Sequence, residues 1–201
     1  MLNVGNLIQD LCTFDIIKVA RRKKMVEQLV ERIRQKDQRA MSQLYRMYVK
    51  RLSSVCFRYV PDEDDAKDVL QDSFVKIFTA LDSFVYHDET SFMRWMIKIV
   101  VNEALHFLKE RSRLLFIDIQ EDSIEAEDDM KADYVTADEL HQMISELPDG
   151  YRTVINLFVF EGYSHQEIAD ILGIERATSA SQLYFAKRLL AKRIKEQTSK
   201  K

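Results

Sequence analysis

Residues 163–190 read YSHQEIADILGIERATSASQLYFAKRLL and predict two short helices joined by a tight turn. Ser164 is followed three residues later by Glu167, a capping box, so we expect a helix from His165. Gly173 then ends this helix, because glycine adopts the left-handed conformation at little cost. Apolar residues recur after the turn at spacings of three and four, which predicts a second helix. Its inward side consists of Leu183, Ala186, Leu189 and Leu190.

The second predicted helix presents polar side chains away from this apolar side. They are Thr178, Ser181, Gln182 and Lys187. Two helices around a short turn form the layout of a helix-turn-helix, whose second helix lies in the DNA major groove. An ordinary αα-hairpin in a bundle fits the same spacing. The small Ala169, the short turn and the lysines and arginines beyond the second helix favour DNA binding, because such cations can contact phosphates.

Composition sets the fold class and excludes several kinds of site. The chain has 201 residues with only four glycines and two prolines, so we expect an all-α fold. Cys12 and Cys56 lack metal-ligand spacing and fit a reducing cytoplasm, so we expect no metal site. No apolar run approaches the roughly 20 residues of a membrane span. No residue set resembles a catalytic triad, a phosphate loop or paired catalytic carboxylates. We therefore expect no enzymatic activity, no cofactor and no small-molecule substrate.

Charge is distributed unevenly along the chain. The net charge is −3, but residues 118–129 carry seven acidic side chains and no lysine or arginine. Residues 114–135 therefore predict a flexible acidic linker, and the rest of the chain is net positive. The linker separates a first helical domain, residues 25–113, from a second, residues 136–198. Residues 1–24 are an N-terminal extension, which is either a short extra helix or a segment upstream of a true start at Met25.

The first domain opens with a helical apolar stripe. The stripe runs from Met25, is interrupted by polar residues 35–39, and resumes to Tyr59, which predicts a long amphipathic helix. This helix should stop at Val60, because Pro61 disfavours helical geometry in the residue before it. Acidic residues 62–65 then begin another helix, where negative charge complements the helix dipole. Its polar side, normally a solvent face, carries Asp65, Asp68, Gln71, Asp72 and Lys76.

A loop and a cationic helix complete the first domain. The loop, residues 81–90, contains Phe84, Val85 and Tyr86, which either pack back on the core or hold an unstacked base. The helix that follows, residues 91–113, carries cations and amides on its outer side. Such side chains fit contacts with a phosphate backbone and its bases, and they fit an ordinary solvent-exposed surface equally well. These residues are Arg94, Lys98, Asn102, His106, Lys109, Arg111 and Arg113.

The second domain is predicted to contain four helices. Thr136 and Glu139 form a capping box, Pro148 and Gly150 separate the first helix from the next, and Gly162 closes the helix of residues 151–160. The two helices of residues 163–190 follow. The whole chain is therefore expected to form two small helical bodies on either side of the linker.

The order of these features resembles the extracytoplasmic-function (ECF) sigma factors of the sigma-70 family. The family motif D-A-x-D-x-x-Q-x-x-F occupies residues 65–74, and F-x-x-W followed by Asn102 begins at Phe92. The motif L-P-x-x-x-R starts at Leu147, and E-G-Y-S-x-x-E-I-A-x-x-L-G-I occupies residues 161–174. The Thr-Ser-x-Ser-Gln run from Thr178 is similar to a Bacteroidetes-type variant. The family usually has a hydrophobic residue where Ser179 stands.

The resemblance implies a cytoplasmic RNA polymerase sigma factor that binds core polymerase and directs promoter-specific transcription initiation. The implied partners are the β′ clamp helices and β-flap of the polymerase, promoter DNA, and an anti-sigma factor. The residues implied to bind polymerase are Asp65, Asp68, Gln71, Asp72 and Phe74. Those implied to bind the minus-ten element are Phe84, Arg94, Lys98, Asn102, His106, Lys109 and Arg113. Those implied to bind the minus-thirty-five element are Arg176, Thr178, Ser179, Ser181, Gln182 and Lys187, with Arg176 and Gln182 favoured for base specificity.

Two other classes of protein fit parts of the pattern. A stand-alone helix-turn-helix regulator would need only the second domain and would leave the face around Asp68 without a role. An adaptor that has lost DNA recognition would explain the weakly basic second helix of the motif. Only a sigma factor would confer promoter-specific initiation on purified core polymerase.

Overall fold

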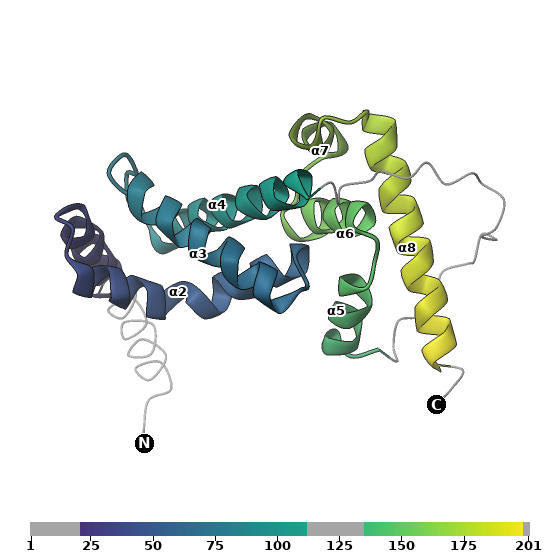
Figure 1. Ribbon diagram of the computed structural model, residues 1–201, viewed down its shortest axis with the longest axis horizontal. Coiled ribbons are helices and arrows are strands. Elements are labelled where there is room, and N and C mark those ends of the chain that lie inside the picture. Colours follow the sequence, from purple (N-terminus) through teal and green to yellow (C-terminus); the bar gives the residue numbers. More distant parts are fainter. Residues whose placement is uncertain (1–20, 112–134, 199–201) are drawn as a thin grey trace, which may run out of the picture.

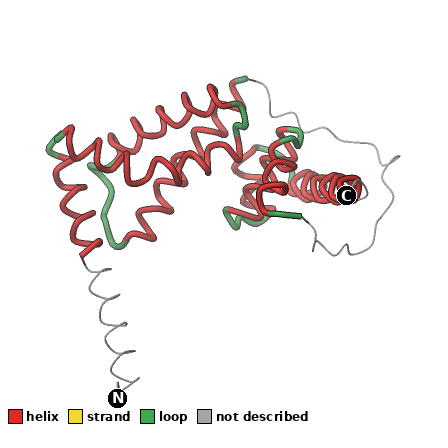
Figure 2. The backbone as a smooth tube through the Cα atoms, turned by 90° about the horizontal axis from the view of Figure 1, so that it is seen from below, coloured by secondary structure: helices red, strands yellow, loops and turns green. Residues whose placement is uncertain are grey.

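The computed structural model describes residues 21–111 and 135–198 (Figure 1). Figure 2 shows helices and loops and no strand within these two ranges, so the all-α prediction is confirmed. Most of the N-terminal extension, Cys12, Arg113, linker residues 114–134 and the last two lysines lie outside the described residues. Within the described ranges, no helix combines the length and the apolar character needed to cross a membrane.

The first helical group contains a helix over residues 21–34 and three helices that pack on one another (Figure 1). These three are α2 (Gln38–Tyr59), α3 (Glu63–Ala80) and α4 (Glu89–Glu110). Their apolar stripes meet in a common core. Its fully buried side chains include Leu44, Tyr48, Ile77, Phe92 and Met96.

The polar interruption at residues 35–39 divides the predicted long helix into two helices. Lys36 has a φ of 60°, and Asp37 caps α2 by accepting bonds from the backbone N–H groups of Arg39 and Ala40. Arg32 donates from Nε and Nη2 to Asp37 Oδ2, at 2.9 and 2.7 Å. The prediction of one continuous helix was therefore wrong, because an aspartate that can cap a new helix competes with continuation of the old one.

The boundary between α2 and α3 follows its sequence signals. Val60 is extended, with φ −120° and ψ 92°, before Pro61. Asp62 then caps α3 by accepting from the backbone N–H groups of Asp64 and Asp65. The predicted end at Val60 and the acidic start of the next helix are confirmed.

The second helical group contains α5 (Ala137–Ser145), α6 (Asp149–Ile155), the π-helical turn η1 (Asn156–Phe160), α7 (His165–Leu172) and α8 (Arg176–Thr198). Capping boxes form at Thr136 and Ser164, as predicted. Gly173 has a φ of 70° and ends α7, also as predicted. Gly150, expected between helices, instead lies buried inside α6, so Pro148 alone marks that boundary.

The helix predicted over residues 151–160 changes its hydrogen bonding midway. From Asn156 the chain forms a π-helical turn, and the N–H of Glu161 donates to the carbonyl of Asn156 at 3.1 Å. Gly162 then closes the segment with a φ of 76°. π-Helical turns are rare in proteins, and those that occur often lie at functional sites.

The two helical groups are in contact at α2. This helix packs against α5 and α6 as well as against α3 and α4. The second group therefore lies at one end of the first (Figure 1).

Candidate functional site

The polar face of α3 presents an acidic and amide surface. Asp68, Gln71 and Asp72 are exposed, and Gln71 and Asp72 follow Asp68 at spacings of three and four. Asp65 belongs to the same face, but its carboxylate is bound by another helix end: Arg111 Nη1 donates to its Oδ1 at 2.7 Å. The guanidinium carbon of Arg111 also lies 4.5 Å from the centroid of the Phe107 ring. The C-terminal end of α4 therefore supports the first turn of α3.

Phe74 does not form part of this surface. Only 4% of it is exposed, and its ring centroid lies 4.6 Å from that of Tyr45 and 5.9 Å from that of Phe78. The motif that suggested Phe74 as a polymerase contact includes a core position, since the residue lies on the apolar side of α3. Phe74 thus packs beneath the polar face, and its assignment as a surface contact is corrected.

A row of cationic and amide side chains runs along α4. Arg94, Lys98, Asn102 and His106 follow at spacings of four, with Lys109 one turn further, and all five are exposed. Spacings of four place side chains on one helix face. His106 Nδ1 lies 3.6 Å from Glu110 Oε1 at the C-terminal end of the row. This arrangement suits a nucleic-acid backbone, to which cations contribute charge and amides contribute hydrogen bonds.

The aromatic loop packs back on the core. The ring centroid of Phe84 lies 4.4 Å from that of Trp95 and 5.4 Å from that of Phe92. Arg34 fixes the loop backbone by donating from Nη2 to the Phe84 carbonyl at 2.5 Å. Of Phe84, Val85 and Tyr86, only Val85 is exposed, at 65%. Of the two roles considered for Phe84, the structure therefore shows core packing, and the assignment as an available stacking platform is corrected.

The outward side of α8 differs from the predicted one. Ser179 is fully buried and Gln182 is 1% exposed, whereas Arg176, Ala177, Ala180, Tyr184 and Lys187 are exposed. Thr178 and Ser181 lie at the edges and are half-buried. Ser179 and Gln182 are therefore corrected from outward contacts to interior residues. The reason is that α8 packs on both α6 and α7, which turns these polar positions inward together with Leu183 and Ala186.

Tyr184 is a surface residue that the sequence analysis missed. It is 51% exposed, and its Oη accepts from Arg188 Nη1 at 3.1 Å. The spacing of four from Arg176 through Ala180 to Tyr184 was the available signal. The family's hydrophobic preference at Ser179 was another, because a hydrophobic residue at that position indicates an inward direction.

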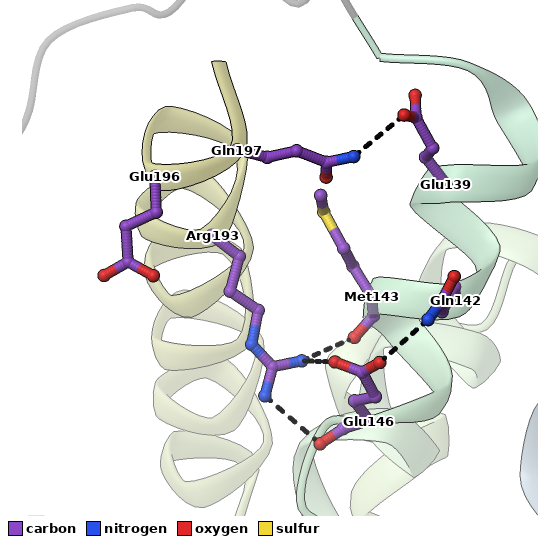
Figure 3. Close-up of a pocket in the computed structure, with 7 residues that line it drawn as sticks. All are labelled: Glu139, Gln142, Met143, Glu146, Arg193, Glu196 and Gln197. Atoms are coloured by element: carbon purple, nitrogen blue, oxygen red, sulfur yellow. Dashed lines mark hydrogen bonds and ion pairs between the residues drawn. The ribbon is translucent and has the colours of Figure 1, made fainter. Parts of the chain in front are cut away.

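Arg193, one of the cations that follow residue 190 and that were expected to contact phosphates, has a structural role. Figure 3 shows Arg193 reaching from α8 to the end of α5, where it donates to the carbonyls of Met143 and Glu146 at 2.9 and 3.3 Å. It also pairs with the Glu146 carboxylate at 3.4 Å. Gln197 donates to Glu139 at 2.8 Å on the same side. Arg193 is thus engaged within the protein, and the expectation that it contacts phosphate is corrected.

The thiol of Cys56 is buried and unreactive. Burial raises its pKa to about 12, so the thiol is protonated at neutral pH. Its Sγ lies 3.4 Å from the carbonyl of Ala66. Because the thiolate is the nucleophile and the metal ligand, this cysteine is suited to packing.

Comparisons with known proteins identify both helical groups. Residues 44–114 match Sigma-70 region 2, and residues 137–190 match Sigma-70, region 4. The ECF RNA polymerase sigma-E factor of Salmonella typhimurium is 32% identical over 181 residues, covering 83% of this chain and 92% of that protein. RNA polymerase sigma factor SigV of Bacillus subtilis is 34% identical over 136 residues, and the match covers 68% of this chain and 80% of SigV.

A solved structure of the sigma factor RpoE with the anti-sigma factor NepR from Bartonella quintana is also similar. It aligns with a TM-score of 0.47 and 22% identity, covering 77% of this chain and 96% of that chain. The two matched regions and the sigma-E relative decide the family. The chain belongs to the ECF sigma factors of the sigma-70 family, which bind core RNA polymerase and direct promoter-specific transcription initiation.

Proposed function

We propose that the polar face of α3 is the surface that binds the β′ clamp helices of core polymerase. Asp68, Gln71 and Asp72 are its exposed members, and Asp65 is oriented by Arg111. The observation that supports this role is the acidic and amide surface at the motif residues. Removing one of these side chains should weaken polymerase binding while the core beneath them remains packed.

The row on α4 is the proposed surface for the minus-ten element. Arg94, Lys98, Asn102, His106 and Lys109 share one exposed face, and Arg113 would extend it beyond the described residues. Cations at regular spacing favour contacts to phosphates, and Asn102 adds an amide that can bond to a base edge. Phe84 has a different proposed role, which is to hold the loop of residues 81–90 against Trp95.

The exposed stripe of α8 is the proposed surface for the minus-thirty-five element. Arg176, Ala180, Tyr184 and Lys187 lie at spacings of three and four, flanked by Thr178 and Ser181. Arginine can bond bidentately to guanine, and an alanine methyl can pack on the thymine methyl. The same domain is proposed to contact the β-flap.

The remaining proposals concern organisation and context. The domains are residues 25–113 and 136–198, joined by the linker 114–135, and the protein acts in the cytoplasm. An anti-sigma factor is its proposed regulatory partner, by resemblance to the family. We also propose that the chain is a Bacteroidetes-type member, because its Thr-Ser-x-Ser-Gln run from Thr178 is similar to that variant.

Run-off transcription with purified core polymerase tests these assignments together. Gln71→Ala should lower the affinity for core polymerase, and Thr79→Ala, at an exposed position near the end of the same helix, should not. Arg176→Ala should leave polymerase binding intact and lower initiation at promoters that depend on the minus-thirty-five element. Equal behaviour of Gln71→Ala and the wild-type protein in polymerase binding would contradict the role of α3.

A further inference from the structure

Helix α2 presents a cationic side to which no role has been assigned. The helix contains lysines and arginines but no aspartate or glutamate. Arg39, Arg46 and Lys50 are exposed, and their spacings of seven and four place them on one side of the helix. Ser42 and Gln43, also exposed, lie between these cations. We call this side, made by the five residues, the cationic face of α2.

The positive charge of this face is not compensated by neighbouring carboxylates. On α3, by contrast, Lys67 Nζ lies 2.9 Å from Glu63, and Lys76 Nζ lies 2.7 Å from Glu103. The three cations of the face form no ion pair with any of the described residues. Their charge is therefore available to a partner in solution.

The cations of the face do not stabilise α2 itself. Arg39 lies in the first turn, where the positive end of the helix dipole disfavours a cation. Arg46 and Lys50 are four residues apart, and like charges at that spacing destabilise a helix. An anionic partner would reduce both unfavourable effects, because it would bring negative charge to the same side of the helix.

A groove on the N-terminal half of this face offers hydrogen-bond donors together with the charge. Its lining residues are Gln38, Arg39, Ser42, Gln43, Arg46 and Met47. The two guanidinium groups are permanently charged donors, and the amides and the hydroxyl also donate. Phosphate oxygens accept hydrogen bonds from all of these side-chain types. The groove is therefore suited to an anion such as a phosphate group.

The composition of the groove favours nucleic acid over an acidic protein. Protein interfaces usually contain a buried apolar or aromatic centre that supplies most of the binding energy. In this groove Met47 is the one apolar side chain, and it is already half-buried. Interfaces with DNA are instead polar and positively charged. The chain belongs to a family that acts on promoter DNA, so this partner is present where the protein works.

We infer that the cationic face of α2 is a further DNA-binding surface, which contacts the phosphate backbone of double-stranded DNA. Arg39 and Arg46 lie about 10 Å apart along the helix axis, at 1.5 Å per residue, so they would contact different phosphates. Contacts to phosphates carry no sequence information. The surface would therefore add affinity without adding specificity. It goes beyond the proposed surfaces, because it belongs neither to α4 nor to α8.

A salt series with the purified full chain tests this surface. The probe is a fluorescent duplex that contains neither promoter element, and anisotropy gives its affinity at each salt concentration. Arg39→Gln with Arg46→Gln should reduce the slope of log affinity against log salt by about 1.8 in magnitude, because each lost phosphate contact contributes about 0.9. Arg39→Lys with Arg46→Lys should keep the slope, since lysine also neutralises a phosphate. Circular dichroism and thermal unfolding verify that each variant is folded.

A matched control removes the same charge elsewhere on the first helical group. Arg22→Gln with Lys67→Gln changes two exposed cations, which pair with Glu89 and Glu63 at 2.6 and 2.9 Å. We expect this control to leave the slope unchanged. An equal reduction in the control would overturn the inference, because any loss of positive charge would then have the same effect.

A fluorescent polyglutamate peptide is the second probe. It carries negative charge without phosphates and represents an acidic protein segment. Weaker binding of this peptide by the Arg39→Gln, Arg46→Gln protein, with an unchanged slope for DNA, would identify an acidic protein as the partner. That result would overturn the inference of a DNA-binding surface.

DNA cleavage shows whether the face contacts DNA in the transcription complex. An iron chelate is attached to Ser42→Cys in a Cys12→Ser background before core polymerase is added, and Cys56 can remain because it is buried. The chelate should cleave promoter DNA outside the two recognised elements. Thr79→Cys, at an exposed position on α3, should cleave that segment much less.

Each result decides the inference. A slope that the glutamine pair reduces and the lysine pair retains, together with cleavage from Ser42→Cys, supports the surface. An unchanged slope in the glutamine pair overturns it, and so does the absence of cleavage from Ser42→Cys. These failures would leave the proposed surfaces on α4 and α8 intact, because the duplex probe contains neither promoter element.

Discussion

The hydroxyl oxygen of Ser179 lies 3.0 Å from Nδ1 of His165 and links α8 to α7. The His165 ring in turn stacks on Phe158, with the ring centroids 4.7 Å apart. Because Ser179 is buried, this contact fixes the rotation of α8 about its own axis. The side that contains Arg176, Ala180 and Tyr184 therefore faces outward.

Tyr184→Ala should change which minus-thirty-five sequences support initiation. An unfavourable change at one base pair costs about 1–3 kcal/mol, so we expect roughly tenfold changes in relative promoter use. Competitive run-off transcription on a set of single-base promoter variants measures the effect. Tyr184→Phe separates the ring from the hydroxyl, which accepts from Arg188. Identical promoter ranking in Tyr184→Ala and the wild-type protein would remove Tyr184 from the reading surface.

Gln182→Ala should destabilise the protein. Gln182 is 1% exposed, and truncating a buried polar side chain costs about 1–3 kcal/mol. Urea unfolding gives the change in the free energy of unfolding. Lys187→Ala, on the exposed side of the same helix, should change it by no more than about 0.5 kcal/mol. A Gln182→Ala protein of wild-type stability with altered promoter choice would restore the residue to the reading surface.

Lys98→Ala should weaken the binding of the minus-ten DNA strand to the holoenzyme. The loss of affinity should be similar for strands of different sequence. If Lys98 contacts one phosphate, the slope of log affinity against log salt should fall in magnitude by about 0.7 for single-stranded DNA. Fluorescence anisotropy over a salt series measures the slope. Lys67→Ala is the matched control, because Lys67 is exposed on α3 and pairs with Glu63 at 2.9 Å. A slope that Lys98→Ala leaves unchanged would argue against a phosphate contact.

Glu167→Gln should lower stability at neutral pH but have progressively less effect in acid. The backbone N–H and hydroxyl of Ser164 each donate to the Glu167 carboxylate at 2.8 Å, and these bonds lower its pKa. A carboxyl group with a lowered pKa stabilises the fold above its unfolded pKa, and this contribution disappears as the pH falls through the folded value. Urea unfolding from pH 7 down to pH 3 compares the two proteins. A constant difference across that range would contradict the role of the ionised cap, and Glu196→Gln controls for the loss of one surface charge.

Much of the local structure follows from residues close together in the chain. Ser164 with Glu167 and Thr136 with Glu139 predict two helix starts, because each capping box closes within one turn. Gly173 predicts the end of α7 for a similarly local reason. The exposed rows on α3 and α4 also follow, since their apolar sides are strongly periodic.

The face of α8 is less predictable. Residues 176–182 contain no large apolar side chain, so their periodicity does not distinguish the inward from the outward side. Ser179 and Gln182 look like surface residues in the sequence, and only the position of α7 and α6 shows that they are interior. Phe84 is a similar case, because whether a loop aromatic is free depends on Trp95 and Arg34, which come from other helices.

The sequence by itself determined that this chain is helical, where most of its helices begin and end, and which family it resembles. Those properties depend on spacing and capping over a few residues. The tertiary structure alone decided which polar residues of α8 face inward and which residues join the two helical groups. Arg58 and Glu161 carry no mark of their pairing in the sequence, because a contact across 103 residues arises only when separate helices pack together.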